Sequence, residues 1–477
     1  MIQRSASAIL SLVLLLVSSP VARTSQLPDT PAGQRVAAYF KAFNTGEQAM
    51  RDFFAENVAA SSLARRPIDA RMDFYRQMRA DMGALEIRKV SKALDNSVAV
   101  LAQTKRGDWF EFGFEFEAAP PHKMLSLRVE ESEPAAEKAS EKNEPASMTE
   151  PQLIEALGKY LDDASAADEF SGAVLIAKKG SPIFQKTCGL ASKEYNIPVR
   201  IDTKFNLGSI NKIFTQIAIG QLADQGSLSL DDKLGKHLTD YPNREAAEKV
   251  TIRQLLDMSS GIGDFFGPEF DATPKDRLRT IKDFLALFAA KPLLFEPGTK
   301  RQYSNGGYVV LGAIIEKVSR RDYYQYVREH IFKIADMKDT DWYEADVATP
   351  NLASGYANEM SKGRGDVVRK NNMYTRPAKG SSAGGGYSTA PDLLKFVAAL
   401  REGKLRVPDF RNERKASGQP AASFRGVGIA GGAPGINAVL EADEESGYTI
   451  IVMSNYDPPS AEKVARQIRG WMSRMKK

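Results

Sequence analysis

The sequence predicts a mixed α/β protein of the α+β kind, with a small N-terminal α+β domain and a larger C-terminal domain. Three observations lead to this prediction. The chain has 477 residues, 43% of them hydrophobic and 26% charged, which is a globular composition long enough for about two to three domains. Helical spacing gives way to strand-like alternation within the first 130 residues. Beyond a segment without aromatic residues, strand patterns lie near both ends of the remainder, with helical patterns between them.

Composition excludes several kinds of protein. The 65 Lys+Arg and 60 Asp+Glu leave a net charge of +5, too small and too mixed for a nucleic-acid binder driven by a basic surface. The single cysteine, Cys188, closes no intrachain disulfide. The three histidines, His122, His237 and His330, are far apart, so we expect no metal centre and no cofactor.

Residues 1–25 are typical of a cleaved signal peptide. Arg4 precedes the apolar run Ala8–Val17, and small residues follow at Ser18 and Ser19. The alternative is an uncleaved N-terminal anchor. No later segment is apolar for long enough to span a bilayer, so we expect no stable transmembrane anchor after cleavage and a secreted or periplasmic protein.

Residues 30–130 predict the small α+β domain. Val36, Phe40 and Phe43 have helical spacing, whereas residues 110–116 alternate phenylalanine with glutamate or glycine as in a strand with one buried face. Helices followed by a curved sheet resemble the NTF2-like domains. The aromatic face either lines a ligand pocket or, as we expect, packs on the helices. Residues 131–149 lack aromatics and predict a flexible linker.

Residues 150–477 predict a second domain built on one antiparallel sheet. Its two ends both contribute to that sheet, with a helical insert between them, and the active site is expected between sheet and insert. The expected elements are a helix over 153–161, strands over 173–177, 183–188, 437–442 and 448–454, and a last helix over 461–475.

The strongest chemical pattern is Ser209-Ile210-Asn211-Lys212 at the start of an apolar helical run that stops near Gly226. Residues three apart on a helix share a face, which brings the hydroxyl and the amine within hydrogen-bond reach. Burial lowers the pKa of a lysine, and a neutral amine can then act as a base towards the serine. The pattern predicts a Ser–Lys nucleophile that needs no histidine.

The same spacing recurs at Ser460–Lys463 and Ser473–Lys476, which we expect on the surface of the last helix. A second motif distinguishes Ser209 from these copies. Tyr303-Ser304-Asn305 lies on a glycine-flanked loop that leads into the apolar helix Val309–Val318. A phenol and an amide from this loop are therefore candidates for the same site.

Together these motifs resemble the serine β-lactamase and penicillin-binding-protein superfamily over residues ~149–477, above all class C β-lactamases, D,D-carboxypeptidases and related esterases. The resemblance implies a β-lactamase-like antiparallel sheet flanked by helices plus a helical insert. Further strings that carry it are Val250-Thr251-Ile252-Arg253-Gln254-Leu255-Leu256-Asp257-Met258-Ser259-Ser260-Gly261, Gly384-Gly385-Gly386-Tyr387-Ser388-Thr389-Ala390-Pro391-Asp392, and Gly432-Ala433-Pro434-Gly435.

The resemblance also implies roles for the site residues. Ser209 would be the acylated nucleophile and Lys212 its proton partner. Tyr303 would carry a proton to the leaving group, and Asn305 would bind the substrate amide or tune Lys212. The implied ligand is a small-molecule or peptide substrate. The sequence makes no prediction about the oligomeric state.

The strand that lines the site departs from the family pattern. The resemblance implies an oxyanion hole from the backbone N–H of Ser209 and the strand edge at Gly431 and Gly432, each donor contributing about 3 kcal/mol. The family's Lys-Thr-Gly motif has a lysine or histidine where this chain has Ile429. That charge helps to bind a substrate carboxylate, so its absence favours neutral esters over β-lactams and D,D-peptides.

Two alternatives compete with this hydrolase. Gly380–Gly384 fits the nucleophile elbow of α/β-hydrolases, but that fold needs a histidine after the serine, and all three histidines precede residue 380. The other alternative is a weak or inactive penicillin-binding-like sensor, which the loss at Ile429 would allow. Retention of Ser209, Lys212 and Tyr303 favours the exported hydrolase.

Overall fold

The computed structural model describes residues 27–65, 67–94, 96–105, 109–132, 147–360, 367–408, 410 and 424–475. The expected signal peptide and residues 133–146 of the expected linker lie outside the described residues. The chain divides into two compact units, Met1–Pro145 and Ala146–Lys477. Within the described part of either unit, no helix is long and apolar enough to cross a membrane.

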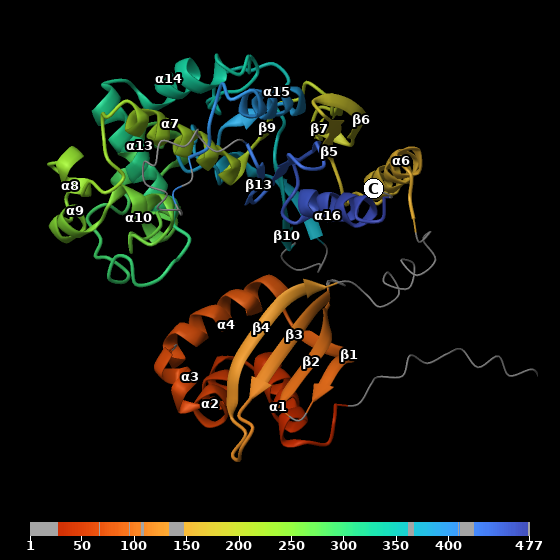
Figure 1. Ribbon diagram of the computed structural model, residues 1–477. Coiled ribbons are helices and arrows are strands. Elements are labelled where there is room, and N and C mark those ends of the chain that lie inside the picture. The colour runs from red at the N-terminus through yellow and green to blue at the C-terminus, as the bar shows by residue number, and fades with distance from the viewer. Residues whose placement is uncertain are drawn as a thin grey trace, which may run out of the picture. The chain divides into compact units, whose positions relative to one another are not determined.

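Over its described residues, the N-terminal unit has four helices packed on one face of a four-stranded antiparallel sheet of order β1-β2-β3-β4 (Figure 1). The predicted order, helices before strands, is confirmed. The helices are α1 (Pro31–Thr45), α2 (Glu47–Asn57), α3 (Ala60–Arg65) and α4 (Ile68–Met82). The strands are β1 (Leu85–Leu94), β2 (Ser97–Thr104), β3 (Trp109–Phe116) and β4 (Met124–Ser132). The resemblance to NTF2-like domains stays a prediction.

The aromatic face of β3 packs on the helices, as expected. Phe112, Phe114 and Phe116 are at most 1% exposed. The ring of Tyr39 on α1 lies 5.1 Å from that of Phe114, edge to face, and Phe40 lies 5.0 Å from Phe112 in the same way. Edge-to-face rings add to the burial of apolar area, so this cluster stabilises the contact between sheet and helices.

The C-terminal unit is built on a five-stranded antiparallel sheet of order β13-β14-β15-β5-β6. The strands are β5 (Gly172–Lys178), β6 (Ser181–Cys188), β13 (Gly426–Ala433), β14 (Ile436–Asp443) and β15 (Tyr448–Ser454). β15 pairs with β5 from Tyr448↔Lys178 to Ser454↔Gly172, so strands from the two ends of the unit are neighbours. The predicted fold class is confirmed, and β13 is an edge strand.

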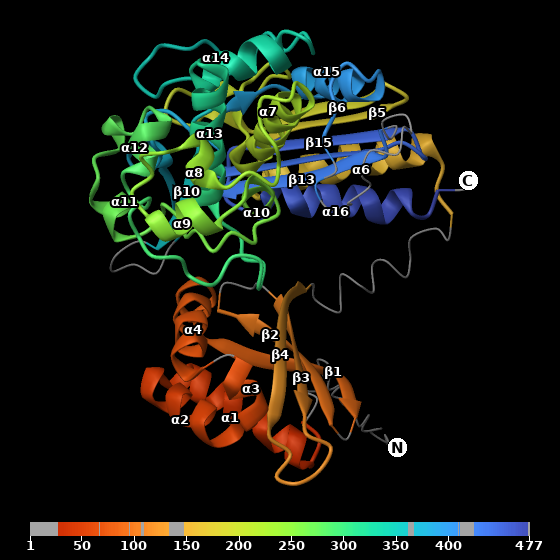
Figure 2. The same cartoon turned by 60° about the vertical axis from the view of Figure 1, so that its left-hand side comes forward.

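Helices cover both faces of this sheet (Figure 2). α6 (Glu150–Ala166) and α16 (Ser460–Met472) pack on one face, around Leu157, Val452 and Ile468. α15 (Ala390–Arg401) and the helical insert pack on the other face, in a larger core that includes Phe214 and Phe396.

The helical insert carries most of the remaining elements. Its longer helices are α7 (Lys212–Asp224) and α13 (Asn305–Ser319). The shorter ones are the 3₁₀ turn η2 (Gly208–Asn211), α8 (Leu234–His237), α9 (Arg244–Lys249), α10 (Ile252–Leu256), α11 (Pro268–Ala272), η3 (Lys275–Arg277), α12 (Ile281–Leu285), α14 (Tyr323–Val327), the π-helical turn η4 (Arg328–Phe332) and η5 (Asn372–Tyr374). Short strands complete the unit: β7 (Leu190–Ser192), β8 (Ile197–Pro198), β9 (Phe205–Asn206), β10 (Tyr356–Met360), β11 (Val367–Asn371) and β12 (Tyr387–Ser388).

Two of the strings that carry the family resemblance are helix starts. The Thr251 side chain accepts a hydrogen bond from the backbone of Gln254, whose side chain returns to Thr251, which forms a capping box for α10. Thr389 accepts from the backbone of Asp392 and so caps α15. Helix capping therefore explains Thr251, Gln254 and Thr389 within these strings.

Candidate active site

Ser209 lies in the 3₁₀ turn η2, one turn before α7 begins at Lys212. The sequence predicts Ser209 at the start of the helix itself, whereas the α-helix begins three residues later. Gly208, with φ +50°, makes the turn possible: a Cβ on it would lie 2.9 Å from the backbone nitrogen of Gly432. The turn is thus pressed against the edge strand β13.

The structure brings the hydroxyl, the amine and the phenol together. Ser209 Oγ lies 2.5 Å from Tyr303 Oη and 3.0 Å from Lys212 Nζ. Both separations are within hydrogen-bond distance. The two partners reach the serine from different parts of the insert, since Lys212 opens α7 and Tyr303 precedes α13.

Lys212 is buried among neutral oxygen atoms. It is 3% exposed, and Nζ also donates to Asn305 Oδ1 at 2.7 Å and to the carbonyl oxygen of Ala383 at 2.6 Å. Burial lowers the pKa of Lys212 from its ordinary 10.5 to about 7, against the negative charge of Asp264, which raises it. About half of the amine is therefore neutral at pH 7, as a base requires.

Tyr303 is held by its backbone neighbours while its ring is half-exposed. The N–H of Gln302 donates to the carbonyl oxygen of Met258 at 2.9 Å, and the Ser304 hydroxyl donates to that of Gly263 at 3.0 Å. Desolvation of the hydroxyl end raises the pKa of Tyr303, although the hydrogen bond with Ser209 lowers it. The phenol is therefore protonated at neutral pH and can donate to Ser209.

Asn305 links the lysine to a carboxylate. It is the first residue of α13, which Ser304 caps by accepting the N–H of Gly307. Its Oδ1 accepts from Lys212, and its Nδ2 donates to Asp264 Oδ2 at 2.8 Å. The structure thus places Asn305 against Lys212, which is one of the two positions expected for it.

The backbone of β13 lies directly beside that of the nucleophile. A Cβ on Gly431 would lie 2.0 Å from the carbonyl oxygen of Leu207 and 2.7 Å from the backbone nitrogen of Ser209. Only glycine permits this approach at Gly431. Gly431 is buried and Gly432 is exposed, so the strand edge next to Ser209 is open to a ligand at Gly432.

β13 carries no charged side chain where the family has a basic one. Its eight residues are Gly-Val-Gly-Ile-Ala-Gly-Gly-Ala. Ile429 is partly buried and packs against the larger core, so it is a wall residue without a hydrogen-bonding group. Over the part of the chain that the structure describes, no group of three or more His, Cys, Asp or Glu is placed to hold a metal ion.

Two groups at the site were missed from the sequence: the Asp264 carboxylate and the Ala383 carbonyl. Asp264 follows the string that ends at Gly261 by three residues, in a glycine-rich loop where an aspartate is an ordinary turn residue. The Ala383 contact depends on backbone geometry. No sequence pattern distinguishes either group.

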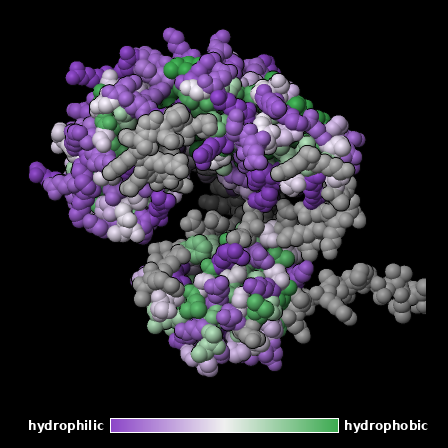
Figure 3. Space-filling view, in the orientation of Figure 1, coloured by the Kyte–Doolittle hydropathy of each residue, from purple (hydrophilic) through white to green (hydrophobic). Residues whose placement is uncertain are grey.

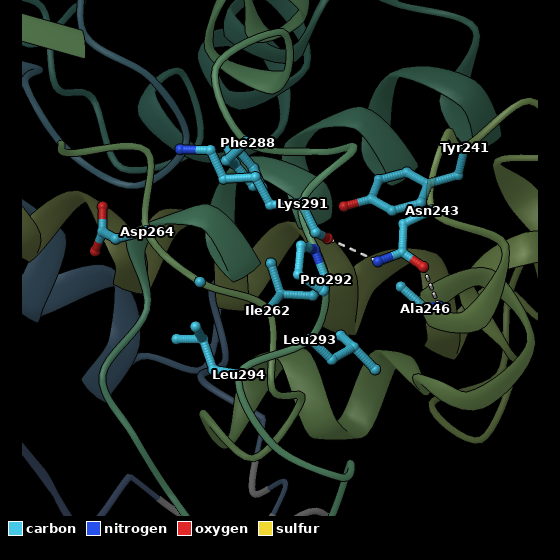
Figure 4. A pocket seen from close by; sticks show the side chains of 11 residues that line it. Tyr241, Asn243, Ala246, Ile262, Asp264, Phe288, Lys291, Pro292, Leu293 and Leu294 are labelled. Carbon is cyan, nitrogen blue, oxygen red and sulfur yellow. Dashed lines mark hydrogen bonds between the residues drawn. The ribbon is translucent and has the colours of Figure 1, made fainter. Parts of the chain in front are cut away.

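A cavity of about 210 Å³ adjoins the site on the far side of the loop that holds Asp264. Figure 4 shows the Asp264 carboxylate pointing away from the other lining side chains. The lining also includes Tyr241, Ile262, Phe288, Lys291 and Leu294. Since none of the lining residues is Ser209, Lys212 or Tyr303, the cavity is a neighbour of the candidate site and not part of it.

The competing serines are unsuited to attack a substrate. Ser381 and Ser382 of the elbow-like segment are at most 2% exposed, and Ser382 Oγ donates to the carbonyl oxygen of Tyr308 at 2.8 Å. The expectation that Ser460 lies on the surface is wrong: it is 9% exposed, because its hydroxyl bonds Ser454 Oγ and the carbonyl oxygen of Glu169 at the start of α16. Ser473 is exposed, as expected.

Comparison with known proteins identifies the family. The family model Beta-lactamase matches residues 153–470, about two thirds of the chain. The protein PbpX of Bacillus subtilis (strain 168), provisionally named a penicillin-binding protein, is 28% identical over 69% of this chain and 84% of its own length. Penicillin-binding protein 4* of the same organism is 31% identical, but the match covers 40% of this chain and less than half, 43%, of that protein.

Solved structures give the same result. A penicillin-binding protein from Bacillus halodurans is 29% identical, with a TM-score of 0.56 over 65% of this chain and 99% of that one. D-amino acid amidase from Ochrobactrum anthropi SV3 is 25% identical, with a TM-score of 0.54 over 67% of this chain and 99% of the other. The chain therefore belongs to the β-lactamase family, within the superfamily of serine β-lactamases, penicillin-binding proteins and related serine hydrolases.

Proposed function

We propose that this protein is an exported serine hydrolase that forms an acyl-enzyme on Ser209 and acts on esters or amides. The observation that carries the proposal is the convergence of Tyr303 Oη and Lys212 Nζ on Ser209 Oγ, at 2.5 and 3.0 Å. Family membership supports the same chemistry.

The protonation states assign the first proton transfer. Lys212, with a pKa of about 7, is the base, and Tyr303, whose pKa is raised, keeps its proton. Ser209 donates its proton to Lys212 Nζ as Oγ attacks the substrate carbonyl carbon. Before the attack, the phenol of Tyr303 donates a hydrogen bond to Ser209 Oγ. After the attack, it donates its proton to the leaving group.

The acyl-enzyme forms when the leaving group departs as an alcohol or amine with the proton from Tyr303. The proton held on Lys212 then neutralises the phenolate, which balances the step. Water hydrolyses the ester on Ser209 in a second cycle. The backbone N–H groups of Ser209 and Gly432 are proposed to stabilise the oxyanion, each by about 3 kcal/mol.

Ile429 favours substrates without a carboxylate. An apolar side chain offers no charge-assisted hydrogen bond to a carboxylate, which is an interaction of about 1.5–3 kcal/mol. Neutral esters and amides lose nothing by this replacement. The 25% identity to a D-amino acid amidase supports including amides among the substrates.

Export is proposed from the pattern of residues 1–25. Sequencing the N-terminus of the mature protein from a bacterial host tests it. A mature chain beginning shortly after Ser19 is expected, and an intact Met1 in the exported fraction contradicts cleavage.

A fluorophosphonate probe tests the function. It should label Ser209 stoichiometrically in the full chain, and Ser209→Ala should remove the label, with Ser381→Ala as the matched control that keeps it. Folded protein without label would favour the sensor hypothesis.

Substrate class has its own test in initial rates. Short-chain aryl esters should be turned over faster than cephalosporins, and Ile429→His should raise kcat/KM for carboxylated substrates by about tenfold, the value of one charge-assisted contact. Cephalosporins turned over as fast as esters by the unchanged protein would contradict the assignment to Ile429.

A further inference from the structure

The Asp264 carboxylate accepts three hydrogen bonds. Oδ2 accepts from the backbone nitrogen of Asn305 at 3.0 Å and from Asn305 Nδ2 at 2.8 Å, while Oδ1 accepts from the backbone nitrogen of Phe266 at 3.1 Å. Within the described residues this carboxylate has no ion-pair partner. Two of its three hydrogen bonds therefore come from one residue of the active site, Asn305.

These contacts fix the orientation of the Asn305 amide. An ionised carboxylate only accepts hydrogen bonds, so the NH₂ group of the amide must face Asp264. The amide oxygen then faces the other way, where it lies 2.7 Å from Lys212 Nζ. The opposite orientation would place oxygen against oxygen at Asp264, which is unfavourable.

The orientation of this amide decides where the lone pair of neutral Lys212 points. A protonated lysine has three N–H bonds, one for each of its neighbours: Ser209 Oγ, Asn305 Oδ1 and the Ala383 carbonyl oxygen. A neutral amine has two hydrogens and one lone pair. Because the amide oxygen and the carbonyl oxygen can only accept, they take both hydrogens, and the lone pair is left facing Ser209.

We propose that Asp264 is a positioning residue that, by fixing the amide of Asn305, directs the lone pair of neutral Lys212 at the Ser209 hydroxyl. The inference rests on the proposed function, since it concerns the base of the acylation step. Without Asp264, the amide can turn and donate Nδ2 to the lone pair of Lys212, in competition with Ser209.

The surrounding backbone holds Asp264 in this position. The Ser304 hydroxyl donates to the carbonyl oxygen of Gly263, and a Cβ on Gly306 would lie 2.2 Å from the same oxygen. On the other side of the loop, the N–H of Leu294 donates to the carbonyl oxygen of Gly261 at 2.8 Å. The loop is thus bound both to the start of α13 and to the segment that lines the cavity.

The nearest cation of the cavity lining does not neutralise Asp264. Lys291 pairs instead with Glu269, at 2.7 Å. The negative charge of Asp264 therefore acts on Lys212 in the active site.

Asp264 has two separable effects on Lys212. The titratable groups that face Lys212 are the phenol rings of Tyr303 and Tyr308, with centroids at 4.8 and 5.5 Å from Nζ, and the Asp264 carboxylate. Its negative charge raises the pKa of Lys212 and so reduces the neutral fraction. Its hydrogen bonds orient the fraction that is neutral. Removing the charge alone and removing the whole side chain should therefore give different results.

The test is the rate of fluorophosphonate labelling of Ser209 in the full chain as a function of pH. Asp264→Asn removes the charge but keeps an acceptor for Asn305, so the midpoint of the acid limb should move to lower pH. Asp264→Ala should show the same shift and, in addition, a plateau of the labelling rate at high pH that is about tenfold lower. The loss is smaller than that of the whole general base, because Lys212 is still present.

Asp283→Asn is the matched control. Asp283 also accepts backbone N–H groups, from Arg279 at 3.1 Å and Thr280 at 2.8 Å, but it caps α12. Its substitution should leave both the midpoint and the plateau of labelling unchanged.

Three results overturn the inference in different ways. Profiles of Asp264→Asn and Asp264→Ala that superimpose on the wild type contradict the role of Asp264 while leaving Ser209 as the nucleophile. A lower plateau without a shifted midpoint indicates damage to the fold only. No labelling of the wild type overturns the proposed function itself. If Asp264→Ala does not fold, the plateau of Asp264→Leu decides, because leucine also offers Asn305 no acceptor, whereas the midpoint reports the charge alone. A wild-type plateau in that variant contradicts the orienting role.

Discussion

The two units bury titratable side chains in opposite ways. In the N-terminal unit, Tyr39 is fully buried among aromatic rings, and its hydroxyl has no hydrogen-bond partner in the described part of the chain. In the C-terminal unit, Lys212 is 3% exposed and contacts three oxygen atoms. Burial shifts both pKa values towards the neutral form, upwards for Tyr39 and downwards for Lys212. Only Lys212 has a group with which to exchange a proton, so a perturbed pKa indicates chemistry only when such a partner is present.

The surfaces of the units do not make this distinction. On the face drawn in Figure 3, hydrophobic residues of both units are scattered among hydrophilic ones. The difference therefore lies in the interior contacts, and the following predictions act on those.

The largest effect is expected when the buried lysine Lys212 is compared with Lys204, a second buried lysine that precedes Ser209 in the chain. Lys212→Met should lower the rate of Ser209 acylation about a thousandfold, because the general base is lost. Lys204 is 7% exposed, but it forms an ion pair with Asp339 at 2.9 Å. Lys204→Met should lower the thermal midpoint and leave the acylation rate within about twofold, since a broken ion pair costs stability only. Intact-protein mass spectrometry against time measures both rates. Equal losses of rate in the two variants would show that Lys212 acts through the fold.

A smaller effect, confined to stability, is expected in the N-terminal unit. Phe114 is 1% exposed, stacks with the ring of Phe116 and meets the ring of Tyr39 edge to face. Phe114→Ala should cost that unit about 3 kcal/mol of unfolding free energy through the cavity left behind. The acylation rate should not change, because the core clusters of the two units share no residue. Calorimetry of the full chain, with labelling at each temperature, checks this. A loss of labelling that follows the unfolding of the N-terminal unit would break the comparison between the units.

The smallest effect is expected from Tyr39→Phe. A buried hydroxyl without a partner costs about 1 kcal/mol or more, so its removal should stabilise the N-terminal unit by that order. Chemical denaturation of the full chain measures the change, as a shift in the midpoint of the unfolding transition of the N-terminal unit. Destabilisation would indicate that the Tyr39 hydroxyl has a hydrogen-bond partner after all, and that the two units do not differ in this respect.

Part of the fold and part of the candidate site could be predicted from the sequence. The alternation at 110–116 predicted β3, because burial on one face leaves a period of two. The strand patterns at both ends of the second region predicted the shared sheet as short apolar runs, since its central strands are buried on both faces. The spacing of Ser209 and Lys212 predicted their contact, since it is local. Tyr303 was found through a motif, not through spacing, because its contact with Ser209 spans 94 residues.

The remaining contacts have no local sequence pattern. Asp264 and the Ala383 carbonyl reach Lys212 or its neighbour only after the insert has folded, and each lies in a glycine-rich loop of ordinary composition. The burial of Ser460 was missed for a similar reason, because its partners Ser454 and Glu169 belong to other elements. The two acceptors that decide the direction of the Lys212 lone pair, Asn305 Oδ1 and the Ala383 carbonyl oxygen, therefore depend on tertiary structure.

The pH dependence of Ser209 acylation tests the central claim most directly. The labelling rate of the full chain by a fluorophosphonate, followed by mass spectrometry of the intact protein, should rise with pH with a midpoint near 7, because the neutral form of Lys212 accepts the proton of Ser209. A midpoint near the ordinary lysine value of 10.5, a rate independent of pH, or a label on a residue other than Ser209 would contradict it.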